Sequence, residues 1–430
     1  MAVTHRSIGV VAESSFGSLV ASTGLPDKTL TYESMPVERD PVIIYGEVIA
    51  SERSDTRDGP YGMPPEPDTV YSSGLRVQRR TGSVELRLDL TSVGAGVANY
   101  DSNYLGKLLG GGFKTAKHSA ATDTSGGAAN ENKFTPGTTS TNYAIGNLIG
   151  VDHNGRAEYS AVTANNVSGD ITISPAVSAS SAIDTGAIIQ MLQTWYADRT
   201  GITEHSLSFR VDGVNFRTFV WGAVLESIAI SLDNGRLMAD LVYQAACIQD
   251  AHNEAAGPVE PVYNSGAPAL FRGAYVVVSS TAPTSRTDAS TGDTLARTEL
   301  DCESFTFTIT NTLTPKGRSN SIIAMSGMDV SDVNVECSLT LSTVDTTLNN
   351  DYFNRQLRQV LIGTGPIGNG LGCALMIPAG YLTTDPSKYD VSGNDIVRQT
   401  LNYAQSRFGG DVSNSGAGNS PVRIGLTVGS

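Results

Sequence analysis

Few residues in this chain combine the types and the spacing that catalysis or cofactor binding requires. Residues 363–368, GTGPIG, fit the pattern G-x-G-x-x-G, whose glycines let a backbone turn approach the pyrophosphate of a dinucleotide. That chemistry needs a strand before the glycines and a helix after them. Here a helical pattern precedes the motif and none follows it. The sequence therefore predicts the end of a helix and a loop, with no bound dinucleotide.

Potential metal ligands are dispersed along the chain. No histidine has a second ligand at i+2, i+3 or i+4, and no two cysteines form the C-x-x-C spacing of a zinc site. These residues are His5, His118, His153, His205, His252, Cys247, Cys302, Cys337 and Cys373. We expect the histidines to be exposed or in turns. We expect the cysteines to be small buried apolar groups of a protein made in a reducing compartment.

Carboxylates are densest within residues 52–68, where arginines alternate with them. The members are Glu52, Arg53, Asp55, Arg57, Asp58, Glu66 and Asp68. Their spacing differs from that of a calcium loop, so a solvated face is the better interpretation. No G-x-S-x-G motif and no P-loop occurs, and a dispersed triad stays open because its members would meet only in the fold. The sequence predicts a protein that is not an enzyme, with no catalytic residue, cofactor or metal site.

The composition is that of a globular β protein. The chain has 430 residues, 45 of them glycine, and a net charge of −14. This charge argues against a surface that grips nucleic acid, since such a surface needs basic patches. The first residues lack the basic region and apolar run of a secretory signal, and no apolar stretch approaches the roughly 18 residues of a membrane span.

The elements that would position any functional residue are mostly strands. Residues 225–245 alternate between apolar and polar on both sides of Asn234-Gly235, which predicts a hairpin with a type I′ turn. It belongs to a meander of about four strands over residues 204–245. Further alternating strands are expected at the positions 29–35, 75–93, 303–315 and 333–344. Short helices are expected at 99–112 and 350–363.

We predict two domains from this pattern. The first covers residues 1–250, with a long loop at 36–68 and an inserted β subdomain at about 113–200. Within the insertion, residues 113–145 are polar and are expected to form a surface loop, and four short strands follow to residue 195. A linker spans residues 251–268. The second domain covers residues 269–430 and contains a polar stretch at 382–420.

The two predicted domains share a sequence repeat. Residues 84–93, VELRLDLTSV, align with residues 335–344, VECSLTLSTV, and a predicted helix follows each copy. Residues 226–234 also align with 303–311, but with a different offset, so we give this match less weight. Convergent β patterning is the alternative explanation. The first match indicates that one strand-and-helix unit was duplicated.

Three blocks of the sequence resemble the major tail tube proteins of phages with long, non-contractile tails. Residues 7–22, SIGVVAESSFGSLVAS, resemble the ES-x-FG opening of that family. Residues 207–245 resemble its core hairpin, and residues 303–317, ESFTFTITNTLTPKG, resemble the strand that opens its second half. The resemblance as a whole covers about 60% of the chain, in separated blocks that follow the family's order. The polar stretches 113–143 and 382–420 depart from the pattern.

The resemblance implies a mainly β fold made of duplicated tail-tube-like β-sandwich or barrel domains, each with a short flanking helix, together with the inserted β subdomain. It implies a structural virion protein, assembled in the host cytoplasm, that forms stacked rings around a conduit for DNA ejection. The implied partners are further copies of the chain, the tape measure, tail terminator and distal tail proteins, and passing DNA bound without specificity. The repeat of 84–93 at 335–344 predicts rings of three copies with six domains, and rings of six identical chains are the alternative. No membrane is implied. The alternatives are a baseplate or distal tail ring protein, a surface adhesin, and an enzyme on a β scaffold.

Overall fold

The computed structural model describes residues 7–18, 27–38, 41–52, 75–90, 100–101, 103–116, 122–138, 140–153, 155–165, 169–177, 183–198, 200–201, 203–213, 217–233, 235–251, 275–280, 298–317, 325–344, 348–365, 372–392, 396–406 and 416–428. Almost all of the predicted linker, 251–268, lies outside these residues. The same holds for residues 53–68 of the predicted loop and for Asn234 of the predicted turn.

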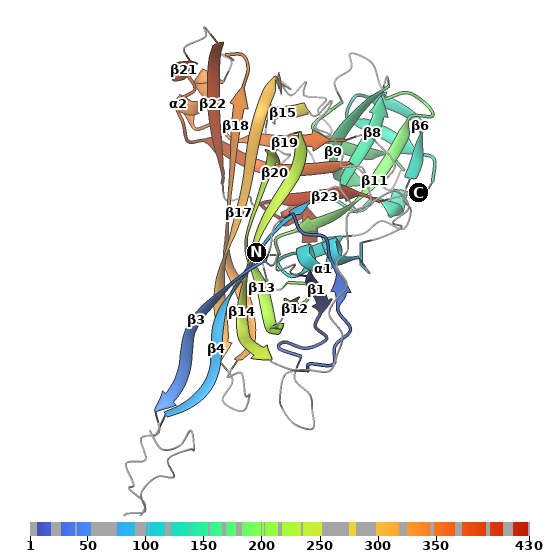
Figure 1. Ribbon diagram of the computed structural model, residues 1–430. Coiled ribbons are helices and arrows are strands. Elements are labelled where there is room, and N and C mark those ends of the chain that lie inside the picture. The colour runs from blue at the N-terminus through green and yellow to red at the C-terminus, as the bar shows by residue number, and fades with distance from the viewer. Residues whose placement is uncertain are drawn as a thin grey trace, which may run out of the picture.

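The fold is mainly β, which confirms the class predicted from the sequence (Figure 1). The strands are β1 (Ser7–Ala12), β2 (Glu33–Ser34), β3 (Val42–Glu52), β4 (Leu75–Asp89), β5 (Lys114–Ala116), β6 (Thr122–Asn130), β7 (Lys133–Pro136), β8 (Leu148–His153), β9 (Arg156–Asn165), β10 (Ile171–Ser174), β11 (Ile188–Tyr196), β12 (Leu207–Asp212), β13 (Arg217–Asp233), β14 (Arg236–Ala251), β15 (Tyr275–Ser280), β16 (Thr298–Leu300), β17 (Cys302–Gly317), β18 (Met325–Leu341), β19 (Arg358–Thr364), β20 (Cys373–Leu382), β21 (Tyr389–Ser392), β22 (Ile396–Gln405) and β23 (Arg423–Thr427). The α-helices are α1 (Tyr104–Gly110) and α2 (Asn349–Asn354), and short 3₁₀ turns lie at Ser140–Asn142 and Gly416–Asn419.

Eight strands form one continuous antiparallel layer, which we call the long sheet. Its order is β3-β4-β14-β13-β17-β18-β22-β21. At its centre β13 pairs with β17, so that Ile228 lies opposite Ile309. Among the described strands, none pairs with the outer side of β3 or of β21. Figure 1 shows the long sheet as the tall layer on the left, with most of the remaining strands to its right.

The strands that belong neither to the long sheet nor to the barrel described below cover one face of the long sheet. Together with the long sheet they form what we call the body. β2, β1 and β12 continue from β13, and β16, β15 and β19 continue from β20, which pairs with both β19 and β22. The main hydrophobic core lies between these strands and the long sheet. It contains Val10, Phe209, Ile309 and Leu375, each at most 1% exposed. The core thus runs through both predicted halves of the chain.

One order of strand pairing occurs twice in this body. The first series is β2-β1-β12-β13-β14-β4-β3. The second is β16-β15-β19-β20-β22-β18-β17. The two series meet where β13 pairs with β17. β4 and β18, the strands of the 84–93 and 335–344 alignment, hold the same place in the two series.

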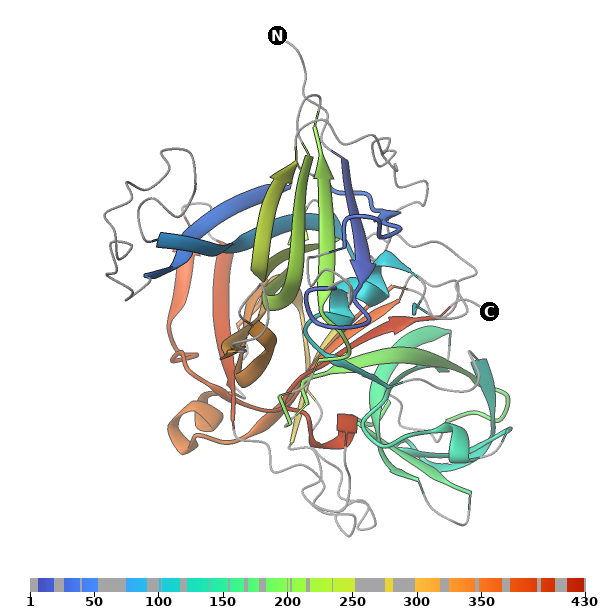
Figure 2. The same cartoon turned by 90° about the horizontal axis from the view of Figure 1, so that it is seen from below.

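Six strands form a separate closed barrel. Pairing runs β6-β7-β10-β9-β8-β11 and returns from β11 to β6. The barrel has a core of its own, which includes Phe134, Tyr143 and Ile173. Seen from below, the barrel stands beside the other sheets (Figure 2). The prediction of a surface loop over 113–145 is wrong, because β5, β6 and β7 lie there and Phe134 anchors β7 in the barrel core.

The barrel is fixed to the body by its last strand and by side chains. Residues 188–191 of β11 belong to the barrel, whereas residues 192–196 pair with β23 in the body. The Tyr159 hydroxyl donates to the carbonyl of Thr364 at 3.1 Å, and the Ser174 hydroxyl donates to Oε1 of Gln359 at 2.7 Å. The barrel therefore joins a strand of the first half to β19 of the second.

Of the two predicted helices, one is confirmed and one is largely wrong. α1 begins after Asn103, whose side chain accepts the N–H of Leu105, and its apolar residues are buried. The helix expected over 350–363 ends at Asn354, because Arg355 adopts the left-handed conformation with φ 49°. Residues 358–364 form β19 between β15 and β20. Val360 and its neighbours are buried on both faces of this strand, so their run is continuous rather than alternating.

Three smaller predictions need correction, and one stretch described from the sequence only as polar contains strands. The stretch 36–68 is not a loop throughout, because Val42–Glu52 pairs with β4 as an edge strand. The polar stretch 382–420 contains β21 and the ten-residue strand β22. The strand expected at 29–35 is limited to Glu33–Ser34. The meander at 204–245 has three strands, since Arg217–Asp233 is a single strand of 17 residues.

Candidate functional surface

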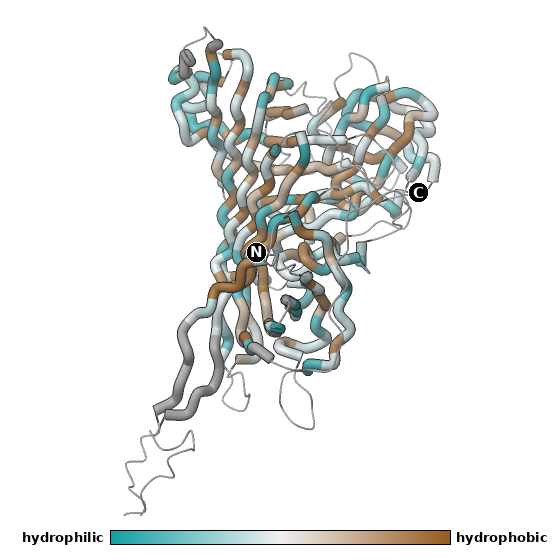
Figure 3. The backbone as a smooth tube through the Cα atoms, viewed as in Figure 1, coloured by the Kyte–Doolittle hydropathy of each residue, from teal (hydrophilic) through white to brown (hydrophobic). Residues whose placement is uncertain are grey.

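The candidate functional surface is the face of the long sheet that points away from the main core, here called the polar face. Alternation in β13 creates it, because Ile228 and Ile230 are buried in the core while Ala229 and Ser231 lie on the opposite side. β17 repeats the pattern, with Phe307 buried between two threonines that face outward. Figure 3 shows this alternation as a succession of brown and paler segments along the strands.

Short uncharged side chains dominate the middle of the polar face. The antiparallel register places Ala229 opposite Thr308, and Thr308 opposite Glu336. Ser227 lies opposite Thr310 in the same way. Such side chains leave the surface smooth and hydrophilic, without the aromatic groups that would stack on a base or a sugar.

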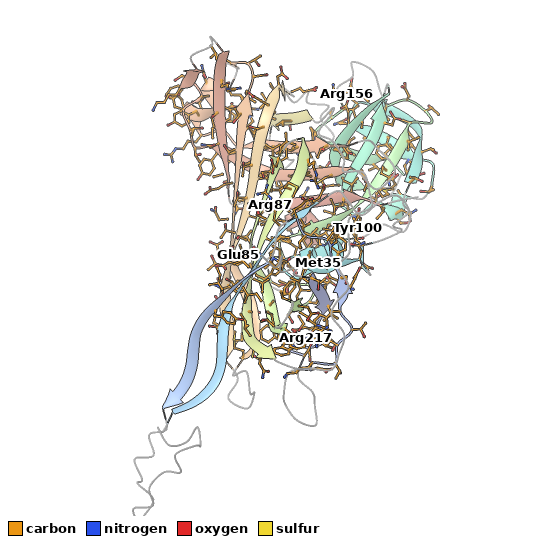
Figure 4. All side chains as sticks on the ribbon, viewed as in Figure 1. Met35, Glu85, Arg87, Tyr100, Arg156 and Arg217 are labelled. Atoms are coloured by element: carbon orange, nitrogen blue, oxygen red, sulfur yellow. The ribbon has the colours of Figure 1, made fainter. Side chains whose placement is uncertain are left out.

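Among the described side chains, the charged groups on the polar face are mainly acidic. Its carboxylates include Glu85, Asp233, Asp240, Glu303 and Glu336, and Figure 4 labels Glu85 and Arg87 on β4. Arg87 binds Asp233, with Nη2 at 2.6 Å from Oδ2, and its Nη1 lies 3.6 Å from Oδ2 of Asp240. Arg398 donates from Nε and Nη2 to the two carboxylate oxygens of Glu303 at 2.7 and 2.8 Å. Both arginines are thus held by carboxylates, which limits their attraction for phosphate.

An apolar patch marks one edge of this surface. On the edge strand β3, Val42 is 39% exposed and Ile44 is 47% exposed. Both lie on the polar-face side of β3, because Val42 is opposite Glu85 and Ile44 opposite Ser83. Exposed apolar side chains on a strand edge are typical of a contact surface. The prediction from the sequence had placed these residues in the loop at 36–68.

A buried carboxylate holds the segment that carries the ES-x-FG motif. Oε2 of Glu13 accepts the N–H of Gly17 at 2.8 Å, and Oε1 accepts the N–H of Gly222 at 3.0 Å. The hydroxyls of Ser206 and Ser208 donate to the same carboxylate. Burial raises the pKa of Glu13, although these donors act in the opposite direction. The glutamate of this motif therefore fixes the turn after β1 to β12 and β13, a role that its sequence position did not reveal.

The residues with potential for chemistry do not come together in the part of the chain that the structure describes. No three His, Cys, Asp or Glu side chains there form a group that could hold a metal ion. His205 contacts the carbonyl of Lys107 through Nε2 at 2.9 Å, and burial lowers its pKa. His5, His118 and His252 lie outside the described residues. The side chain of His153 does so too.

The cysteines are free thiols. Burial raises the pKa of Cys302 to about 11, and it raises the pKa of Cys337 and Cys373 further. These three thiols are therefore protonated near neutral pH and are poor nucleophiles or ligands.

The GTGPIG motif lies between two strands. Gly363 and Thr364 belong to β19, so the expectation that a helix precedes the motif is wrong. The described chain resumes at Gly372 and enters β20. The strand-to-helix turn that a dinucleotide requires is therefore replaced by a connection between adjacent antiparallel strands.

Comparisons with known proteins give no assignment. The sequence matches no protein-family model and no curated protein sequence. Neither described α-helix has the length and apolar character needed to cross a lipid bilayer.

Proposed function

We propose that this chain is a structural subunit of a long, non-contractile phage tail. It forms closed rings with the polar face of the long sheet toward the bore, and the rings stack into the tail tube through which DNA is ejected. The chain is not an enzyme in this proposal. It assembles in the host cytoplasm, becomes part of the virion, and contacts the tape measure, tail terminator and distal tail proteins.

The long sheet is the observation that carries the proposal. Among the described residues, one of its faces packs on the core, the other is polar and carries no covering layer, and its two edges, β3 and β21, have no partner on their outer sides. Because it has an even number of antiparallel strands, β3 of a rotated copy would run antiparallel to the opposite edge, which consists of β21 and of the end of β20 that pairs with β22 on the same side as β21. In a ring the edges of neighbouring sheets pair with each other, so they are not exposed to uncontrolled pairing with other chains, which leads to aggregation.

The repeated order of pairing supports duplicated tube domains and a ring of three copies. Each series from β1 to β14 and from β15 to β22 would be one domain, with α1 and α2 as the flanking helices and the barrel inserted in the first. Three chains of two domains each would place six domains around the bore. β13 and β17 show how neighbouring domains would join, since their pairing is continuous across the two series.

The charge of the polar face supports passage of DNA without retention. Among the described side chains, the carboxylates named above outnumber the arginines, and Arg87 and Arg398 are engaged by acidic partners. Fixed negative charge repels the phosphate backbone, and short hydroxyl side chains offer few base contacts. A tube with this lining would let the genome slide. A lining of free lysines would hold it.

Electron microscopy of the purified chain tests this proposal. We expect tubes or rings with an axial hole, and native mass spectrometry of single rings should give three copies. Six copies per ring would retain the tube and overturn the trimer. Single rings that never stack would favour the baseplate or distal ring alternative, and fibres would favour the adhesin. Monomeric particles at all protein concentrations, with and without other tail proteins, would overturn the proposal.

A further inference from the structure

The seam between β13 and β17 provides a template for the contact between subunits. Along this seam Ile228 lies opposite Ile309, with Ala229 opposite Thr308 and Ser227 opposite Thr310. Because the two series of strands share one pairing order, each residue of the seam has a counterpart at an outer edge of the same chain. Those counterparts follow from the strand registers.

The counterpart of Ile309 is Ile43. The sequence repeat aligns Val84 of β4 with Val335 of β18. Val84 lies opposite Ile43 in the β3–β4 pair, and Val335 lies opposite Ile309 in the β17–β18 pair. Residues 42–44 of β3 therefore hold the position that residues 308–310 hold in β17.

The counterpart of Ile228 is Leu382. In the first series Leu86 lies opposite Leu241, which lies opposite Ile228. The repeat aligns Leu86 with Cys337, which lies opposite Tyr403, and Tyr403 lies opposite Leu382. Residues 381–383, at the end of β20, therefore hold the position that residues 227–229 hold in β13.

We propose that adjacent subunits join by antiparallel pairing of residues 42–44 of one chain with residues 381–383 of a second copy. The register puts Leu382 opposite Ile43, Thr383 opposite Val42, and Tyr381 opposite Ile44. This inference rests on the proposed function, because it requires a ring of identical chains. It adds to that function the specific edges and the register.

The environment of the two edges agrees with this pairing. Ile43 packs against the main core and Leu382 is buried, so both are fixed in place as Ile309 and Ile228 are. Ile44, by contrast, is exposed on the polar-face side of β3. An aromatic side chain directly opposite a β-branched one is a favourable cross-strand pair, so Tyr381 of the neighbour would cover it.

This seam is shorter than the internal one. After Thr383, whose N–H donates to the carbonyl of Asn402, the chain turns at Asp385, which accepts the N–H and the hydroxyl of Ser387. The turn interrupts the strand before β21 begins. Subunits would therefore separate more readily than the two halves of one chain.

Disulfide cross-linking between chains tests the register. Two proteins are prepared, one with Val42→Cys and one with Thr383→Cys, and they are mixed before assembly and oxidised. Residues directly opposite on antiparallel strands lie within disulfide reach. On a non-reducing denaturing gel we expect a linked dimer from the mixture and none from either protein alone. The double variant V42C/T383C should give dimers and trimers.

Matched variants separate the possible outcomes. Ala229→Cys with Thr308→Cys, on the internal seam, should give an internal disulfide and a monomer on the gel. Val42→Cys mixed with Thr400→Cys, which lies within the polar face, should give no dimer. Rings that form without the Val42–Thr383 link, or that link through Thr400 instead, overturn this register and leave the tube function intact. Absence of rings from the unmodified chain overturns both.

Discussion

Ile228 of β13 lies directly opposite Ile309 of β17, and both side chains are fully buried in the main core. The two isoleucines come from opposite sides of the predicted linker at 251–268. Because this pair belongs to a continuous ladder and to a continuous core, the two halves cannot separate without exposing apolar surface. The unit available for assembly is therefore the whole chain.

Gly235→Val should weaken the β13–β14 hairpin. Gly235 has φ 76°, a conformation that strains a β-branched residue by about 1–3 kcal/mol. We expect a loss of that size in the free energy of unfolding, measured by urea titration, and fewer assembled particles. Gly317→Val is the control, since Gly317 has open space around it and no positive φ. Equal stability of the two variants would show that the turn tolerates valine.

Glu13→Ala should destabilise the chain by about 1–3 kcal/mol or more. It leaves the N–H groups of Gly17 and Gly222 without their acceptor, and buried donors without partners are costly. Glu299→Ala is the control, because Glu299 forms an exposed ion pair with Arg156 whose loss should change stability by about 1 kcal/mol at most. If unfolding midpoints of both variants matched that of the unmodified chain, Glu13 would have no anchoring role.

His205 should make stability fall as the pH drops below about 6.5, the ordinary histidine value. Burial lowers its pKa in the folded chain, so the unfolded chain takes up the proton first. Proton uptake then favours unfolding, and the contribution is fully present only above the ordinary value. Melting temperatures between pH 7.5 and 5 should decline more steeply for the unmodified chain than for His205→Gln. Parallel curves would rule out His205 as the source.

Positive charge on the polar face should retain DNA. We expect Ser231→Lys with Thr310→Lys to assemble normally but to bind double-stranded DNA within the tubes, with an affinity that falls as salt rises. The control carries lysines at the exposed positions Thr122 and Asn354, on the barrel and on α2. Co-sedimentation of DNA with tubes measures the effect. Equal retention by both variants would place the polar face away from the bore.

Residues 53–74, which connect β3 to β4, should join one ring to the next. The hairpin of β3 and β4 extends beyond the body of the molecule (Figure 1), so the ends of these two strands that the segment joins lie at a distance from the subunit core. Replacement of residues 53–74 by a short Gly-Ser turn should leave folded subunits that form single rings. Equal-length Gly-Ser replacement of residues 178–182, between β10 and β11, is the control. Full-length tubes from the shortened variant would place the stacking contact elsewhere.

The central strands of the long sheet, from β4 to β18, could be predicted because one of their faces is polar. In β13, β14 and β17 the burial alternates, so the apolar residues recur with period two and Gly235 marks the turn. β19 could not be predicted in this way. Because both of its faces are buried, its apolar residues form an unbroken run. The spacing of this run from Phe353 fits a helix in the sequence, but in the structure α2 ends before Arg355.

The barrel and the candidate surface could not be predicted from sequence patterns, because both depend on contacts between residues that are distant in the sequence. β6 and β7 have few apolar residues and are held by pairing in the closed barrel, with Phe134 as a buried anchor. The polar face could not be predicted without the order of strands, because Arg87 of β4 and Asp233 of β13 are distant in sequence and meet only when β14 pairs with both strands. The match of residues 226–234 with 303–311 belongs to β13 and β17, which are neighbours and hold different places in the two series.

The position of β23 has a consequence for the timing of synthesis. β23 pairs with both β11 and β20, and the Tyr100 hydroxyl donates to the carbonyl of Thr427, 327 residues later in the chain. The covering layer is therefore incomplete until these late residues leave the ribosome, and such distant contacts slow folding. A nascent chain cannot yet present a finished edge to its neighbours. In the proposed assembly, pairing between subunits therefore follows synthesis of β23.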